Sequence, residues 1–279
     1  MSLRRNVEVP AQIAIVISLL ALTAAAQEKK EFTYNGGPRA VVSITNNYGP
    51  ITVKPSRNRQ VVVETVSHSD AVGLVNEQHA DRIELRAISS RPGTDLVDYT
   101  VLVPVDAFVS LRSSDGTLRA QGLRGDVILE AAAASVEVTD ISDAHLHVKT
   151  LSGPITLTDI RNSHLDIHSV SGNVTIRNVT GPSVEVNSGS GRISYQGDPG
   201  STGEYLLTSH SGDLDISIPA SALVDIKARS IKGQPDPDFP IASGFSAAGT
   251  GNLLLKPGTV IGSRFDLRSF RGKIRLKRP

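Results

Sequence analysis

The chain lacks cysteine and tryptophan altogether, and its 279 residues include a single methionine. Disulfide bonds and thiolate metal sites are therefore excluded. The absence of tryptophan weakens the case for a sugar-stacking groove. Neither sign of charge is in large excess, because the chain has 29 Lys and Arg residues and 28 Asp and Glu residues. Such a balanced chain has no strong overall field to attract nucleic acid or acidic lipid, and we expect no nucleic-acid partner.

The one long apolar run is at the N-terminus. Arg4 and Arg5 precede the segment Ile13–Ala26, which ends in small residues, as in an export signal. We therefore assign residues 1–26 to a signal peptide that is cleaved before Gln27, and expect a periplasmic, cell-surface or secreted protein. The alternative is an uncleaved inner-membrane anchor formed by residues 9–26. Only in that case would the protein contact the membrane.

A short pattern of serine, glycine and alternating apolar residues recurs along the chain. Its glycines are Gly153, Gly172, Gly191 and Gly212, with spacings of 19, 19 and 21 residues. A fixed period of this length is typical of a repeat architecture. Each unit contains two stretches with period-two alternation and two corners, which indicates two short strands per coil.

The aligned coils predict an all-β fold, a parallel β-solenoid with coils of 19–21 residues. Coils stack at about 4.8 Å per step, so equivalent strands join into two parallel sheets that enclose an aliphatic core. We assign the repeats to residues 111–279, with an irregular Pro- and Gly-rich loop at 234–251.

Residues 32–110 are less regular but rich in strand patterns, and we predict that they form a β-rich cap over the sticky end of the stack. The segment Ala71–Ala80 is the best of few helix candidates. The expected strands are Ala40–Thr45, Ile51–Lys54, Val61–Val66, Arg82–Ala87 and Tyr99–Val103.

The repeated corners carry small residues whose role we interpret as structural. The glycines suit left-handed turn conformations; they are Gly116, Gly153, Gly172, Gly191, Gly212 and Gly272. A ladder of hydroxyl residues lies three positions before each corner glycine; it comprises Ser113, Thr150, Ser169, Ser188, Ser209, Ser230 and Ser269. No base is placed beside these hydroxyls, and no strand-to-helix glycine loop is present, so we assign neither a catalytic residue nor a cofactor.

A histidine-rich patch is the best candidate for chemistry. Five residues alternate with inward-pointing ones and therefore face outward: His145, His147, His164, Asp166 and His168. Stacking places His145 beside His164 and His147 beside Asp166, close enough to share a metal ion. The patch is equally explained as a solvated polar face, and we assign no metal site.

Paired carboxylates offer a second candidate. Asp213 and Asp215 flank Leu214, and Asp236 and Asp238 lie in the Pro-rich loop. Such pairs cleave glycosidic bonds in enzymes, and some β-solenoids degrade polysaccharides. Here the acidic residues are scattered between turns and surface positions, so a polysaccharide-active enzyme is kept only as an alternative.

The serial Ser-x-Gly corners, with Tyr99–Pro104 leading into Val109–Gly116 and with Ser211–Pro219, resemble a known bacterial family. This is the β-strand-repeat "putative adhesin" family, a domain of unknown function, and the resemblance covers about Ala40 to Leu276. It implies a right-handed or flattened β-solenoid on the cell envelope, and it brings no catalytic residues to carry over.

We therefore predict a non-catalytic, exported, adhesin-like β-solenoid that is a binding or structural module of the cell envelope. Its partner would be an envelope protein or polysaccharide. A second alternative, besides the enzyme, is a membrane-tethered periplasmic module in envelope signalling. The binding residues are not identified by the sequence.

Overall fold

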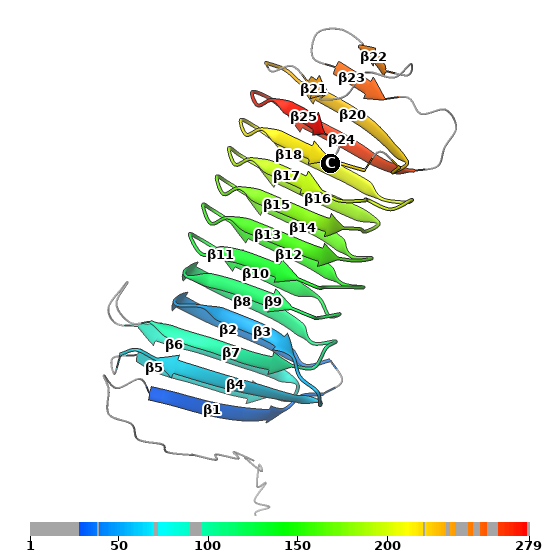
Figure 1. The fold of residues 1–279 in the computed structure, drawn as a ribbon. Helices are drawn as coiled ribbons and strands as arrows, with labels where there is room; N and C mark the ends of the chain where they lie inside the picture. The colour runs from blue at the N-terminus through cyan, green and yellow to red at the C-terminus, as the bar shows by residue number, and fades with distance from the viewer. Residues whose placement is uncertain are drawn as a thin grey trace, which may run out of the picture.

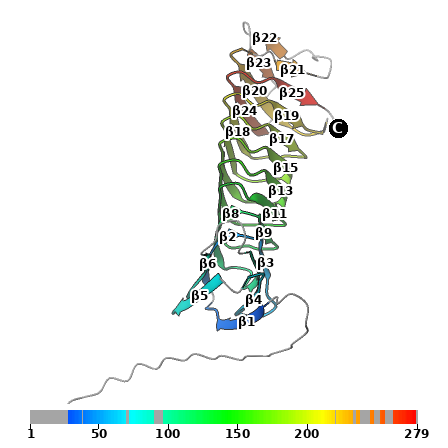
Figure 2. The same cartoon turned by 90° about the vertical axis from the view of Figure 1, so that its left-hand side faces the viewer.

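The computed structural model describes residues 28–37, 39–69, 72–89, 96–219, 221–232, 235–237, 245–247, 252–255 and 262–277. The regular secondary structure in these segments consists of β-strands alone. The strands form two sheets that face each other (Figures 1 and 2). The all-β solenoid expected from the repeats is therefore confirmed.

The first sheet is built in spatial order from the following strands: β1 (Glu28–Asn35), β4 (Gln60–Ser67), β7 (Val97–Val103), β3 (Ile51–Pro55), β9 (Thr117–Gln121), β11 (Ser135–Thr139), β13 (Ile155–Ile160), β15 (Val174–Val179), β17 (Ile193–Gln196), β19 (Leu214–Ser217), β25 (Ile274–Lys277) and β21 (Pro235–Pro237). 

The second sheet is built in the same way: β22 (Phe245–Ala247), β23 (Asn252–Leu255), β20 (Val224–Ser230), β24 (Ser263–Ser269), β18 (Glu204–Ser209), β16 (Ser183–Ser188), β14 (His164–Ser169), β12 (His145–Thr150), β10 (Val127–Ala131), β8 (Phe108–Asp115), β2 (Val41–Tyr48), β6 (Arg82–Ser89) and β5 (Val72–His79).

From β8 to β19 each coil contributes one strand to each sheet, and successive coils pair in parallel. Leu165 of β14 pairs with Leu146 of β12 and with Val184 of β16, as the alignment of the repeats predicted. The repeat length therefore sets the register: one coil of 19 residues returns the chain to the equivalent position in the next layer.

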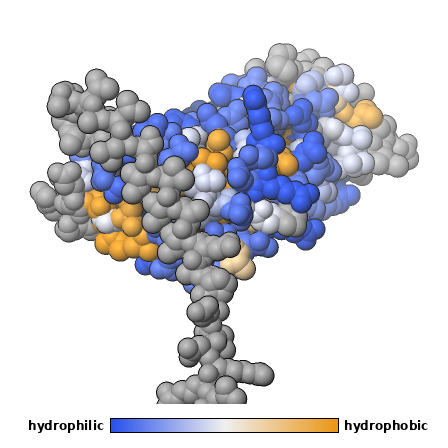
Figure 3. Space-filling model, turned by 90° about the horizontal axis from the view of Figure 1, so that it is seen from below, coloured by the Kyte–Doolittle hydropathy of each residue, from blue (hydrophilic) through white to orange (hydrophobic). Residues whose placement is uncertain are grey.

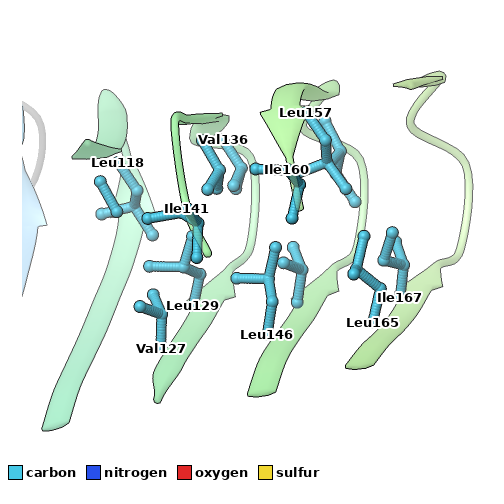
Figure 4. Close-up of a cluster of buried hydrophobic side chains, with 14 of the residues drawn as sticks. Leu118, Val127, Leu129, Val136, Ile141, Leu146, Leu157, Ile160, Leu165 and Ile167 are labelled. Carbon is cyan, nitrogen blue, oxygen red and sulfur yellow. The ribbon is translucent and has the colours of Figure 1, made fainter. Parts of the chain in front are cut away.

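The aliphatic core lies between the two sheets (Figure 4). Leu118, Val136 and Leu157 of the first sheet face Leu129 and Leu146 of the second, and these side chains are at most 1% exposed. Ile141 and Ile160 close one side of the core and are fully buried. Burying an aliphatic side chain of this size contributes about 1.5–3 kcal/mol, and each coil adds several. The stack is therefore stabilised layer by layer.

The five strands expected between residues 40 and 103 are present, but the helix expected at Ala71–Ala80 is not. Residues Val72–His79 form β5, which pairs antiparallel with β6 as a hairpin. The two strands are joined at Ala80 and Asp81, and Ala80 takes a left-handed φ of 54°. Gly73 and the β-branched Val72 and Val75 disfavour a helix, and cross-strand pairing decides the outcome.

The N-terminal end of the stack departs from chain order. The coil of β2 and β3 lies against β8 and β9, while β6 and β7, which come later in the chain, lie outside it. At this end β1 pairs antiparallel with β4, β4 pairs antiparallel with β7, and β5 pairs antiparallel with β6. These strands join the same two sheets as the repeats, and the role of residues 32–110 as a cap stays a prediction. Viewed from below, this end is mostly hydrophilic, with separate apolar patches (Figure 3).

The C-terminal end also departs from chain order. Strand β24 pairs with β18 on one side and with β20 on the other. The last strand of this sheet in the chain therefore lies between β18 and β20, although both precede it in the sequence. The irregular loop expected at 234–251 falls outside the described residues except for β21 and β22. No helix in the described residues is long and apolar enough to span a membrane, and residues 9–26 lie outside them.

The corner glycines differ from the expectation in their backbone conformation. Only Gly116 of the six has a left-handed φ, of 117°. At Gly172 a Cβ atom would lie 2.0 Å from the carbonyl oxygen of Gly153 in the preceding coil, and Gly191 has the same relation to Gly172. At Gly172 and Gly191 the coils therefore approach so closely that a side chain would require the backbones to shift, although the equivalent corner position in an earlier coil is Ala134.

The left-handed conformations occur instead at the opposite corner. Asp140, Asp159 and Asn178 occupy equivalent positions in three successive coils, with φ between 52° and 56°. Asn178 Nδ2 donates to Asp159 Oδ1 over 3.0 Å, which links neighbouring coils. Asp and Asn tolerate this backbone conformation better than other non-glycine residues.

Candidate functional site

The histidine patch is assembled by strands β12 and β14 as the sequence predicted. The rings of His145 and His164 stack with their centroids 5.0 Å apart. Asp166 accepts contacts from both neighbouring histidines: His147 Nδ1 and His168 Nε2 each lie 2.9 Å from one of its carboxylate oxygens. His145 Nδ1 lies 3.1 Å from Asp126 Oδ1. The patch is thus a set of partly exposed histidine–carboxylate pairs.

No group of three or more His, Asp or Glu side chains in the described segments has an arrangement suited to a metal ion. Both oxygens of Asp166 are already engaged, one by each histidine. The geometry therefore fits the polar-surface interpretation, in which the side chains satisfy each other across adjacent strands.

Asp213 and Asp215 are held by arginines. Arg275 Nη1 lies 2.9 Å from Asp213 Oδ2 and 3.1 Å from Asp215 Oδ1, and Arg192 Nη1 lies 3.0 Å from Asp215 Oδ2. Burial alone would raise the pKa of Asp213, but the Lys273 amide and the Arg275 guanidinium outweigh it and lower that pKa below its usual value. A general acid in glycoside hydrolysis needs a raised pKa, so Asp213 lacks this property.

The hydroxyl ladder is buried and hydrogen-bonded to its own corners. Thr150, Ser169 and Ser188 donate to the carbonyl oxygens of Gly153, Gly172 and Gly191, over 3.1, 2.7 and 2.9 Å. Ser209 instead accepts from the Gly212 amide over 2.9 Å. These hydroxyls therefore stabilise the corners, which is the role that the sequence indicated.

A long groove runs along this corner, across the ends of the strands of the second sheet. Its volume is about 1190 Å³, and its lining extends from Thr45 of β2 to Arg229 of β20. Typical pockets for small ligands have volumes of about 300–1,000 Å³. We call this feature the corner groove.

Three rows of residues line the corner groove. The hydroxyl ladder forms one row. A polar rim comes from the outward residues just before the ladder: Thr45, Arg112, Glu130, Lys149, His168, Asn187, Thr208, Arg268 and Arg229. A largely apolar stripe comes from the residues just after it: Ala132, Leu151, Val170, Gly189, His210, Phe270 and Ile231.

The apolar stripe is exposed although its residues would be expected in a core. Leu151 and Val170 are each 59% exposed, and Ile231 is 73% exposed. Phe270 is half-buried and stacks on His210 with ring centroids 5.0 Å apart. Exposed apolar side chains that follow one another along a groove are typical of an interaction site.

The sequence signal for this stripe is the apolar residue that directly follows several of the hydroxyl residues. The ladder residues point inward, so the residue after each of them must point outward. Ala132, Leu151 and Val170 are apolar at this outward position in three successive coils. The sequence could not show that the ladder, the rim and the stripe form a continuous hollow, because this depends on the shape of the corner.

Comparison with known proteins places the chain in a family. Residues 39–239 match the model of a domain described as Toastrack DUF4097, whose function is unknown. The chain belongs to the Toastrack DUF4097 family. This agrees with the bacterial adhesin-like family that the corner motifs resembled. No curated protein matches this Toastrack chain.

Several solved structures are similar to this Toastrack protein at low identity. A "putative adhesin" from Bacteroides fragilis is 10% identical, with 91% of this chain and 99% of that chain covered and a TM-score of 0.47. A "putative cell adhesion protein" from Clostridium sporogenes is 12% identical, with coverage of 90% and 100% and a TM-score of 0.33. A "putative lipid binding protein" from Parabacteroides distasonis is 12% identical, with coverage of 89% and 96% and a TM-score of 0.38. These likenesses are too distant to bear on what this chain binds.

Proposed function

We propose that this Toastrack protein is an exported, adhesin-like module of the cell envelope, which binds its partner along the corner groove and catalyses no reaction. The observation that carries the proposal is the exposed stripe of Leu151, Val170 and Ile231 along a groove of about 1190 Å³. A rigid stack of coils presents such a surface without conformational change, so little entropy is lost on binding.

Export is supported by the sequence of residues 1–26, in which Arg4 and Arg5 precede an apolar run that ends in small residues. Mass spectrometry of the N-terminus in fractionated cells tests this part. A chain that begins near Gln27 in an exported fraction supports a free module. A chain that begins at Met1 in the membrane fraction supports the tethered form, and Met1 in the cytoplasmic fraction contradicts both.

Binding is tested with the purified protein and with envelope fractions from the cells that make it. We expect Leu151→Asp to abolish sedimentation with the envelope, because a charge replaces the apolar contact. Ile88→Asp is the matched control, since Ile88 is 51% exposed but does not line the corner groove. Equal sedimentation of both variants and the parent would contradict a role for the groove.

A further inference from the structure

The corner groove is chemically different at its two ends. Near β8, Arg112 Nε lies 2.9 Å from Glu130 Oε2, so the charges of this end are neutralised. Near β20 and β24 the cations are in excess. Arg268 is engaged with Asp266, over 2.6 and 2.9 Å, but Arg229, Lys232 and Arg271 form no ion pair with other described residues.

The excess cations gather around one aromatic ring. Lys232 Nζ lies 5.6 Å from the centroid of the Phe270 ring, and the guanidinium carbon of Arg271 lies 5.9 Å from it. Arg229 is the register partner of Arg268 on the adjacent strand. Asp266 is paired with Arg268 and also attracts Arg229, so one carboxylate serves two guanidinium groups, and a bound anion would neutralise the positive charge that remains. We call Arg229, Lys232, Arg268 and Arg271 the cationic end of the groove.

Between the two ends, the apolar stripe offers almost no hydrogen bonds. The backbone amides of Leu151, Val170 and Gly189 donate to carbonyl oxygens of the preceding coil, over 2.9–3.2 Å. The hydroxyls of Thr150 and Ser169 beside them are bound to their own corners. A peptide or sugar lying along this stripe would find partners only at the polar rim, and its polar groups that face the stripe would stay unpaired, which is unfavourable. A hydrocarbon chain has no such groups.

The dimensions of the stripe fit the hydrocarbon chain of a membrane lipid. The coils from Leu151 to His210 are three steps of about 4.8 Å apart, or roughly 14 Å in total. One leaflet contributes half of the hydrocarbon core of a bilayer, which is about 30 Å thick, so a lipid chain spans about 15 Å. A chain of this length that starts at Phe270 therefore reaches Val170, which is three steps away.

We propose that the corner groove holds the hydrocarbon chain of an individual anionic lipid along Gly189 and Val170, with the phosphate of its headgroup on the cationic end. This inference rests on the function proposed above and names its ligand class. The overall charge balance of the chain gave no reason to expect an acidic lipid. The total conceals a local excess of cations, and it is this excess that meets the headgroup.

The inference is tested by calorimetric titration of the full exported chain with lysophosphatidylglycerol that carries a 16-carbon chain, below the concentration at which it forms micelles. We expect one lipid per chain. Lysophosphatidylcholine, whose headgroup is zwitterionic, should bind about 10-fold more weakly, because it neutralises less of the cationic excess. Glycerol phosphate, which has the headgroup without the hydrocarbon chain, should show no binding. Binding of glycerol phosphate as strong as that of the lipid would overturn the proposal.

Two pairs of variants separate the contributions of the groove. Val170→Asp should weaken binding at least about 10-fold, and Ile88→Asp should leave it unchanged. The double variant Lys232→Glu and Arg271→Glu should weaken binding of the anionic lipid and remove its preference over the zwitterionic one. Lys277→Glu, on the first sheet, is its control. All five residues are exposed, so the fold is expected to persist, and circular dichroism verifies this.

The outcomes distinguish this inference from the function on which it rests. Lack of lysophosphatidylglycerol binding, or equal binding by Val170→Asp and the parent, overturns the lipid proposal. If Leu151→Asp still abolishes sedimentation with the envelope in that case, the groove binds a different partner and the proposed function stands. If an acidic peptide prevents sedimentation with the envelope while no lipid binds, the ligand is a protein and the lipid proposal is contradicted.

Discussion

Arg275 Nη1 lies 2.9 Å from Asp213 Oδ2, although the two residues are 62 positions apart in the chain. The contact joins β25 to β19, so it holds the inserted last coil against a coil that was made much earlier. The Lys273 amide adds a second bond of 2.9 Å to the other oxygen of Asp213. This carboxylate therefore adds two bonds to the backbone pairing of β19 with β25 that positions the C-terminal coil.

We expect Arg275→Ala to lower the free energy of unfolding by about 1–2 kcal/mol, because two partly buried carboxylates lose a charged hydrogen-bond donor. Urea denaturation measures the effect. Arg264→Ala is the control: Arg264 pairs with Glu204, but the two side chains are 66% and 74% exposed. Exposed pairs contribute little, so this variant should unfold like the parent. Equal losses for both variants would contradict the proposed role of Arg275.

The same carboxylate predicts sensitivity to acid. The folded state lowers the pKa of Asp213 below its usual value, despite the opposing effect of burial. A group of this kind stabilises the fold at pH values above its unfolded pKa of about 3.9, and the stabilisation is lost as the pH falls through the folded pKa. Thermal unfolding should therefore show a deficit for Asp213→Asn at pH 7 that narrows as the pH falls below the unfolded pKa of about 3.9. A deficit that is constant with pH would indicate lost packing instead.

Gly172 should not tolerate even a methyl group, because its Cβ would lie 2.0 Å from the Gly153 carbonyl oxygen. We expect Gly172→Ala to destabilise the protein by about 2 kcal/mol or more, since two stacked backbones would have to separate. Gly73→Ala is the matched control, because the nearest atom to its Cβ would be 3.8 Å away. Urea denaturation of the two variants compares them directly. A similar stability of both would show that the coils can move apart at the corner.

The burial of the aligned apolar residues between the two sheets can be tested by placing a charge among them. Ile167 is fully buried between the sheets, and its register partners are Val148 and Val186. Ile167→Asp should therefore cost about 3 kcal/mol or more. Ser183→Asp places the same carboxylate on the exposed end of β16 and should have little effect. If both variants melt at the temperature of the parent, the assignment of Ile167 to the core is wrong.

The order of the last coils can be tested by cross-linking, because the native chain has no cysteine to interfere. Thr208 of β18 is in register with Arg268 of β24, and Arg229 of β20 is one strand further away. Adjacent strands are about 4.8 Å apart, which suits a disulfide, whereas two steps exceed its reach of about 7 Å. Cysteines at 208 and 268 should form a disulfide, and cysteines at 208 and 229 should not. The opposite result would mean that the coils follow chain order.

The sequence predicted the parts of the fold that repeat. Period-two alternation and a constant spacing place Leu165 between Leu146 and Val184, because each coil has the same length and the apolar residues must face inward. The pairing of His147 with Asp166 followed from the same register. These are local consequences of one rule, applied coil by coil.

The sequence did not predict features that depend on contacts between distant segments. Either β20 or β24 could pair with β18, because both strands have the same pattern of inward-facing residues. Phe265 of β24 and Ile226 of β20 could each follow Tyr205 in the core. The close approach at Gly172 is set by the shape of the corner and not by its own φ. The corner groove was missed for the same reason, because its hollow is a property of the stack.

The inserted position of the last coil also limits when this protein can finish folding. A stack in chain order grows from one end, and each new coil closes on the one made before it. Here β18 and β20 cannot have their final neighbour until Ser263–Lys277 has been synthesised. The cationic end of the groove takes Arg268 and Arg271 from this segment, so a product truncated before Ser263 would lack these two charges although it contains the rest of the groove.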